Sequence, residues 1–215
     1  MSDKEARALI IKNYAMFEDV YKESMDSIGP DICGEIAIIV KTFIEENHWE
    51  GGYSFWDDDE LWFAPLSWKI NENVGTDAFK AKYKFVFVTD NKTSEDTYGE
   101  CCFYLSPFFG VGATQTSFCF AIERKYIGNP KATEWYNYCL NHPLYNKFKK
   151  GFTLTKDGNL FNPFRLDSEA VANAYDSGIF EDVLEPVKNS LKNIIENHTM
   201  FEQLLADAEN KFKAQ

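Results

Sequence analysis

Residues 47–68 read Asn-His-Trp-Glu-Gly-Gly-Tyr-Ser-Phe-Trp-Asp-Asp-Asp-Glu-Leu-Trp-Phe-Ala-Pro-Leu-Ser-Trp and contain four of the five tryptophans of the chain. Before this stretch apolar residues recur at helical spacing, and from Gly51 onward they alternate, which is typical of strands. The acidic run at 57–60 lies between two strand-like segments, 53–56 and 61–68, which predicts a β-hairpin with the acidic run at its tip. The change of period indicates an α+β protein.

The segment before the change, residues 1–48, is predicted to be helical. A first helix begins at the capping box Ser2-x-x-Glu5 and runs to about Met25. Gly29-Pro30 is expected to end it. Asp31 can cap a second helix, whose apolar face is broader than a surface helix needs and is therefore expected in the core.

Residues 51–125 are predicted to form an antiparallel β-meander. After the hairpin, strands are expected at Tyr83 to Thr89, Cys101 to Leu105 and Ser117 to Ile122. Pro65 cannot donate a hydrogen bond to a neighbouring strand, which predicts an edge strand or a bulge. On the same segment, one face is expected to carry Trp62, Ala64, Leu66 and Trp68.

The C-terminal part is predicted to contain a helix at 130–150, a hairpin at 152–161 and helices over 167–213. Pro186 is expected to start or kink the last helix. An apolar stripe follows at alternating spacings of four and three: Phe180, Leu184, Val187, Leu191, Ile194, His198, Phe201 and Leu205. Such a stripe packs against another helix, either within the chain or in a homodimer through the C-terminal helix.

These elements predict one α+β domain over residues 1–215, an antiparallel sheet meander packed with N-terminal and C-terminal helices. The chain can bury a real core, since aromatic residues make up 16% of it. No apolar run approaches the ~20 residues that span a bilayer, so no membrane contact is expected. Five cysteines without a C-x-x-C pair indicate free thiols and a cytoplasmic setting.

The charge of the chain restricts its partners. It carries 34 acidic and 22 basic residues, a formal net charge of -12. Such a charge repels phosphate backbones, so direct nucleic-acid binding is disfavoured, and it attracts basic proteins. The chain resembles, in composition alone, acidic inhibitors and immunity proteins that neutralise nucleases or other nucleic-acid-binding proteins. We therefore expect an acidic binding protein that inhibits a basic, nucleic-acid-processing partner.

The residues expected to contact this partner lie at the hairpin tip and in one later loop. Asp57, Asp58, Asp59 and Glu60 lack the alternate spacing around a glycine that a calcium loop requires, so a protein contact is favoured over a metal, and no metal or other cofactor is expected. Trp56 adjoins the acidic tip and is the natural aromatic anchor. Phe108 and Phe109 lie in a predicted loop, where they must either pack or bind something.

An enzymatic alternative rests on Glu123-Arg124-Lys125, which closes an apolar strand. In an E-x-K arrangement a carboxylate can hold Mg²⁺ while the lysine positions the attacking water. A helix with Glu35, then strands, then E-x-K resembles the layout of PD-(D/E)xK nucleases. The chain lacks their Pro-Asp element, so Asp90 or Glu100 would have to supply the second carboxylate.

Overall fold

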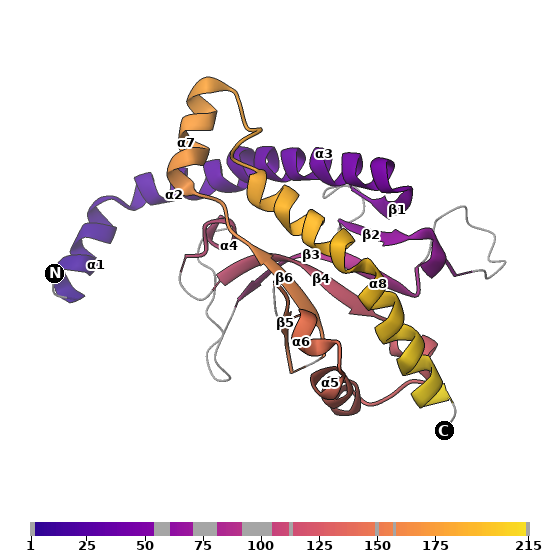
Figure 1. Cartoon of the computed structure of the whole chain (residues 1–215). Coiled ribbons are helices and arrows are strands. Elements are labelled where there is room, and N and C mark those ends of the chain that lie inside the picture. Colours follow the sequence, from indigo (N-terminus) through magenta and orange to yellow (C-terminus); the bar gives the residue numbers. More distant parts are fainter. Residues whose placement is uncertain are drawn as a thin grey trace.

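The protein consists of one β-sheet with helices packed against it, as the change of sequence period predicts. The computed structural model describes residues 3–53, 61–70, 81–91, 105–111, 114–148, 151–156 and 158–213, with the backbone alone at 3, 90, 91 and 114. One antiparallel sheet has the order β1-β2-β3-β4-β6-β5 (Figure 1). Its strands are β1 (Trp49–Gly52), β2 (Trp62–Pro65), β3 (Tyr83–Asn91), β4 (Thr114–Ile122), β5 (Thr153–Leu154) and β6 (Leu160–Phe164). The predicted α+β class is confirmed.

One face of the sheet is lined by phenylalanines because residues paired across antiparallel strands point to the same side. Phe85 on β3 is paired with Phe63 on β2 and with Phe120 on β4. The ring centroids of these two pairs lie 5.5 and 5.4 Å apart. All three side chains are buried, and this face is the core side of the sheet.

Two helices, α3 (Gly29–Asn47) and α8 (Glu185–Lys213), lie over this face (Figure 1). The broad apolar face predicted for α3 is buried, and so is most of the stripe predicted for α8: Val187, Leu191, Ile194, Phe201 and Leu205. Leu191 and Ile194 therefore pack inside their own chain. Pro186 occupies the first turn of α8, as predicted.

The N-terminal segment differs from its prediction at Gly29-Pro30. The chain forms α1 (Asp3–Lys12), α2 (Tyr14–Glu23) and a π-helical turn η1 (Ser24–Ile28), and it enters α3 without a loop. The predicted stop at Gly29-Pro30 is wrong. Pro30 lies in the first turn of α3, and the preceding π-turn changes the hydrogen-bond register where the missing proline N–H would break an α-helix.

The remaining helices are short. They are α4 (Ser106–Phe109), α5 (Ala132–Asn141), α6 (Tyr145–Phe148) and α7 (Ser168–Ser177), with 3-10 turns η2 (Leu66–Trp68) and η3 (Arg124–Ile127). α7 lies near the start of α3, where the Tyr175 hydroxyl donates a hydrogen bond to the Ile28 carbonyl (Figure 1). The helix predicted at 130–150 is divided into α5 and α6, whereas the predicted hairpin β5–β6 is present, and Gly158 in its turn has a φ of 84°. In the described part of the chain, no helix is both long and apolar enough to cross a membrane.

The second arm of the first hairpin also needs correction. β2 lies between β1 and β3, so it is neither an edge strand nor bulged, and Pro65 is its last residue. The chain then turns into η2, which leaves Leu66 51% exposed while Trp68 is buried. Phe63, and not its neighbour Trp62, points into the core. The strand expected to start at Ser117 begins three residues earlier, at Thr114, and residues 101–104 of another predicted strand lie outside the described residues.

Candidate functional site

The base of the β1–β2 hairpin is held firmly by an aromatic cluster. The indole of Trp49 is buried, and its ring centroid lies 5.4 Å from Phe43, 6.0 Å from Phe63 and 6.1 Å from Phe85. These rings come from α3, β2 and β3, so one tryptophan joins three elements. A large buried aromatic of this kind fixes where the hairpin leaves the sheet.

Close backbone packing at Gly51 fixes the hairpin further. A Cβ atom added at Gly51 would lie 2.2 Å from the carbonyl oxygen of Trp62 and 2.9 Å from the Cα of Phe63. Only glycine fits between the two strands at this point. A hairpin is present, but its first strand is Trp49–Gly52 and not the predicted 53–56. Tyr53 is in no strand, and residues 54–60, which include Trp56 and the acidic run, lie outside the described residues.

Three exposed carboxylates, Glu45, Glu46 and Glu50, surround this base. Glu45 and Glu46 lie in the last turn of α3, which contains no basic residue. The carbonyl end of a helix carries partial negative charge, so an acidic residue there is unfavourable by about 0.3–1 kcal/mol. A cation from another molecule would relieve this repulsion. We call Glu45, Glu46 and Glu50 the acidic rim, and we include in this name the acidic run 57–60, which joins β1 to β2 in the sequence and lies outside the described residues.

A half-buried histidine lies directly behind the hairpin base. The ring of His198 on α8 lies 5.2 Å from Trp49 and 5.9 Å from Trp68. Its Nε2 atom is 3.5 Å from the Glu202 carboxylate, which also accepts a hydrogen bond from the Ser67 hydroxyl. Burial lowers the pKa of His198, and the nearby Glu202 opposes that shift only in part. The imidazole is therefore neutral near pH 7 and acts as a packed aromatic ring.

The lowered pKa of His198 predicts a loss of stability on acidification. The unfolded chain binds a proton at His198 more readily than the folded chain does. The contribution of the neutral imidazole to the free energy of unfolding is therefore complete above about pH 6.5, the ordinary pKa of histidine, and it decreases as the pH falls below that value. We expect the free energy of unfolding, measured in urea at pH 7.5 and 5.5, to fall on acidification. His198→Phe should reduce that fall, and the exposed variant His48→Asn should not. An equal fall in wild type and His198→Phe would contradict the assignment.

The E-x-K residues pair with each other. Glu123 and Lys125 form an exposed ion pair at the end of β4, where η3 begins. The hydrogen bond from Lys125 to Glu123 raises the pKa of the lysine, with a further contribution from Tyr126. The lysine is thus a solvated cation beside one carboxylate.

The other carboxylates of the nuclease alternative do not converge on Glu123. Asp90 is paired with Gln115 on β4, which lies eight residues before Glu123. The backbone of Asp90 is therefore roughly 26 Å from that of Glu123. Glu35 is in the first half of α3. This end of α3 lies near α7, whose Tyr175 hydroxyl donates a hydrogen bond to the Ile28 carbonyl, and it is far from η3 (Figure 1). Glu100 lies outside the described residues. Among the residues with described side chains, no three His, Cys, Asp or Glu could together hold a metal ion.

The two phenylalanines predicted as a contact pair lie in α4, not in a loop. Phe108 is fully buried, and its ring centroid is 6.1 Å from that of Phe87 on β3. Its carbonyl accepts a hydrogen bond of 2.8 Å from the Leu166 N–H. Phe108 therefore packs in the core and offers no surface to a partner, whereas Phe109 is half-buried.

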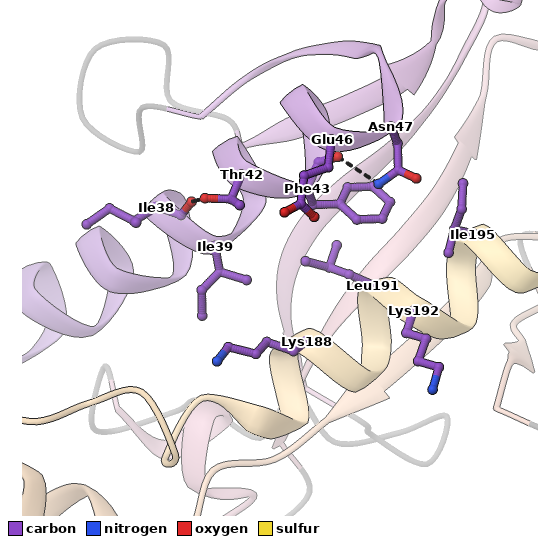
Figure 2. Close-up of a pocket in the computed structure, with 10 residues that line it drawn as sticks. All are labelled: Ile38, Ile39, Thr42, Phe43, Glu46, Asn47, Lys188, Leu191, Lys192 and Ile195. Atoms are coloured by element: carbon purple, nitrogen blue, oxygen red, sulfur yellow. Dashed lines mark hydrogen bonds between the residues drawn. The ribbon is translucent and has the colours of Figure 1, made fainter.

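Sequence reasoning missed an apolar groove of about 460 Å³ between α3 and α8. Ile39 and Phe43 from α3 and Leu191 from α8 extend into the space between the helices (Figure 2). The rest of the groove lining is Ile38, Thr42, Glu46, Asn47, Lys188, Lys192 and Ile195. The available signal was Ile38, which is apolar and 59% exposed although it lies off the core face of α3.

The described part of the chain thus offers a firmly based hairpin next to the acidic end of α3, and an apolar groove between α3 and α8. The two features share Glu46, which also lines the groove. Neither feature is a catalytic constellation. Comparison of the chain with protein-family models, curated proteins and solved structures found no match.

Proposed function

We propose that this protein is an acidic, non-enzymatic binding protein that captures a basic protein through the acidic rim. The observation that carries the proposal is the acidic end of α3, whose last turn contains no basic residue, next to a hairpin whose base is fixed by Trp49 and Gly51. A preorganised base lowers the entropy that binding must cost. The rim would compete with nucleic-acid phosphates for the basic surface of a nucleic-acid-processing partner, and so inhibit it as an immunity protein or anti-defence inhibitor does.

Long-range attraction supports the same proposal. A net charge of -12 steers a basic partner toward the chain and accelerates association, and added salt screens this effect. Trp56, next to the acidic run, would supply the apolar anchor that slows dissociation. We place this binding in the cytoplasm, which agrees with the free, buried thiol of Cys139.

Neutralising the rim is expected to weaken capture of the partner. The first variant carries Asp57→Asn, Asp58→Asn and Asp59→Asn, and the second carries Glu45→Gln, Glu46→Gln and Glu50→Gln. We expect both to recover basic partners from the native host less efficiently than wild type, with association of an isolated partner slowed about tenfold or more at low salt.

A matched control removes three exposed charges elsewhere: Glu169→Gln, Asp176→Asn and Asp182→Asn. It should capture as well as wild type, since it changes the net charge equally and leaves the rim intact. Equal recovery by the first variant and wild type would remove the hairpin tip from the site. If the control lost as much recovery of basic partners as the rim variants do, the binding would depend on net charge alone and not on the rim.

The Mg²⁺-dependent nuclease alternative makes an opposite prediction. Purified protein is incubated with DNA and with RNA, each with and without Mg²⁺ or Mn²⁺. We expect no cleavage, because Glu123 is paired with Lys125 and Asp90 is distant. Metal-dependent cleavage that disappears in Glu123→Ala would overturn the binding proposal in favour of the enzyme.

A further inference from the structure

The N-terminal helices α1 and α2, residues 3–23, form an arm that extends away from the sheet (Figure 1). None of the residues of α2 is buried. Large apolar side chains of the arm are between 46% and 75% exposed: Leu9, Ile10, Ile11, Tyr14, Met16, Val20 and Tyr21. No other element among the described residues exposes apolar side chains in this density, and a monomer rarely leaves such a surface wet.

Part of this apolar surface forms one face of α2. Tyr14, Phe17, Val20 and Tyr21 follow one another at spacings of three, three and one, which place them on the same side of an α-helix. Phe17 is half-buried, and the other three are exposed. The arm cannot fold back to cover this face on its own body. It continues through η1 into α3, and the described chain has no loop at which it could reverse direction.

The groove between α3 and α8 has the shape and chemistry that such a helix requires. Amphipathic helices bind by laying their apolar side into a hydrophobic groove, commonly one between two other helices. This groove is apolar along its floor, and Lys188 and Lys192 lie along its α8 side (Figure 2). On the arm, Glu18 and Glu23 are the acidic residues of α2 nearest its apolar face. In the single chain Glu18 pairs with Lys22, while Lys188 and Lys192 pair with Glu181 and Glu196. These pairs are exposed and therefore weak, so docking of the arm can exchange them for contacts between its carboxylates and the two lysines.

We propose that the arm of one copy lies in the α3–α8 groove of a second copy, and that the second arm occupies the first groove in return. This exchange closes a two-fold dimer and covers both uncovered apolar surfaces with the same contact. The groove lining runs from Ile38 to Asn47 on α3, roughly 14 Å, so it holds the middle of an arm that is roughly 32 Å long and 10 Å wide, and the ends of the arm lie on the partner's surface beside the groove. Two reciprocal contacts along the whole arm remove on the order of 1,200 Å² from water. That area lies at the lower end of stable protein interfaces.

A membrane is a poorer occupant for the arm. Helices that lie on membrane surfaces carry a basic polar face, which is attracted to anionic lipids. The arm has five acidic residues, Asp3, Glu5, Glu18, Asp19 and Glu23, against four basic ones, Lys4, Arg7, Lys12 and Lys22. Its mixed charge favours a protein groove that provides cations at its edge.

The test uses two charge insertions in the full chain. Phe17→Glu places a carboxylate in the apolar face of the arm, and Ile38→Glu places one in the groove, where the exposed position of Ile38 leaves the core unchanged. Ile179→Glu, at a 65% exposed position outside both surfaces, is the control. Mass is measured by light scattering over a concentration series, with circular dichroism confirming that each variant is folded.

We expect wild type and Ile179→Glu to dimerise, and each of the other variants to have a dissociation constant raised about tenfold or more. A mixture of Phe17→Glu and Ile38→Glu should associate better than either alone, because one intact arm then meets one intact groove. This measurement needs no basic partner, so its outcome is independent of the binding function proposed above.

Three results would overturn the exchange. A wild-type chain that stays monomeric at all concentrations has no such dimer. A dimer lost in Phe17→Glu but kept in Ile38→Glu has the arm paired elsewhere, for instance with the other arm. Monomeric protein that sediments with phosphatidylcholine–phosphatidylserine vesicles, and no longer does so as Phe17→Glu, identifies a lipid surface as the occupant.

Discussion

Phe201→Ala is expected to remove a large part of the stability of the fold. The Phe201 ring is fully buried on α8, with centroids 4.6 Å from Phe120, 4.7 Å from Phe148, and 5.2 Å from both Phe85 and Phe152. Truncation of such a ring costs about 3–5 kcal/mol through lost burial and the cavity left behind. Since a domain is stable by only about 5–15 kcal/mol, the variant should unfold at a much lower urea concentration.

Two comparisons make this result specific. Phe201→Leu keeps most of the apolar volume and should lose less than half as much free energy. Leu66→Ala truncates a side chain that is 51% exposed, and it should stay within about 0.5 kcal/mol of wild type. If Phe201→Ala cost no more than Leu66→Ala, the aromatic cluster would not be the centre of the core.

Gly128→Ala is expected to lower the free energy of unfolding by about 3 kcal/mol, because it combines backbone strain with a backbone clash. Gly128 has a φ of 95°, which an alanine adopts only at a cost of about 1–3 kcal/mol. A Cβ atom there would also lie 2.4 Å from the carbonyl oxygen of Phe212, which is backbone and cannot rotate away. The last turn of α8 would have to move, and overpacking of this kind costs a further ~1–3 kcal/mol.

The chain offers two matched controls for this substitution. Gly178 has a φ of 72° and no atom within 4 Å of an added Cβ, so Gly178→Ala measures the conformational cost without the clash. Gly34 lies in α3 with open space around it, and Gly34→Ala should stabilise the protein by about 0.5–1 kcal/mol. Urea unfolding should rank the stabilities Gly34→Ala, wild type, Gly178→Ala, Gly128→Ala. Equal losses at Gly178 and Gly128 would show that α8 does not approach η3 so closely.

Local periodicity was sufficient to predict the fold class and most elements. The alternation of Tyr83, Phe85 and Phe87 predicts β3 and its core face, because side chains of a strand point to opposite sides in turn. The turn at Gly158 predicts the pairing of β5 with β6, since tight hairpins need positive φ angles. The stripe of α8 is visible for the same reason, although spacing alone could not say that its own sheet covers Leu191 and Ile194.

Features that depend on neighbouring segments escaped prediction. Pro30 usually marks a helix boundary, and a pattern of residue types cannot show that a π-turn carries the helix past it. Pro65 indicates an edge, but a proline at the last position of an interior strand needs no ladder hydrogen bond. Phe108 was expected in a loop, and its burial depends on contacts with β3 and Leu166 that lie far away in sequence.

The candidate sites show the same limit. The spacing of Glu123 and Lys125 suggests two side chains on one strand face, but the strand ends at Ile122, and the two groups meet each other. The register of β3 on β4 removes Asp90 from the same site, and register is a property of the pairing and not of either strand. The acidic end of α3, by contrast, could have been seen in the sequence, since Glu45 and Glu46 precede the end of a predicted helix.

The π-turn at η1 has one further consequence, for the rotational phase of the arm. A π-turn is equivalent to one residue inserted into an α-helix, and each residue of an α-helix turns the chain by about 100°. The wider π-turn takes up this extra residue in about the same rotation, so α2 and α3 stay nearly in phase across it. Removing one residue between Ser24 and Ile28 would therefore restore a plain helix and leave the apolar face of the arm pointing in nearly the same direction. Removing one residue from α2 itself would instead rotate the part of the arm before it by about 100°. The π-turn is thus the one place on this helix where a single-residue deletion preserves the direction in which the arm can associate.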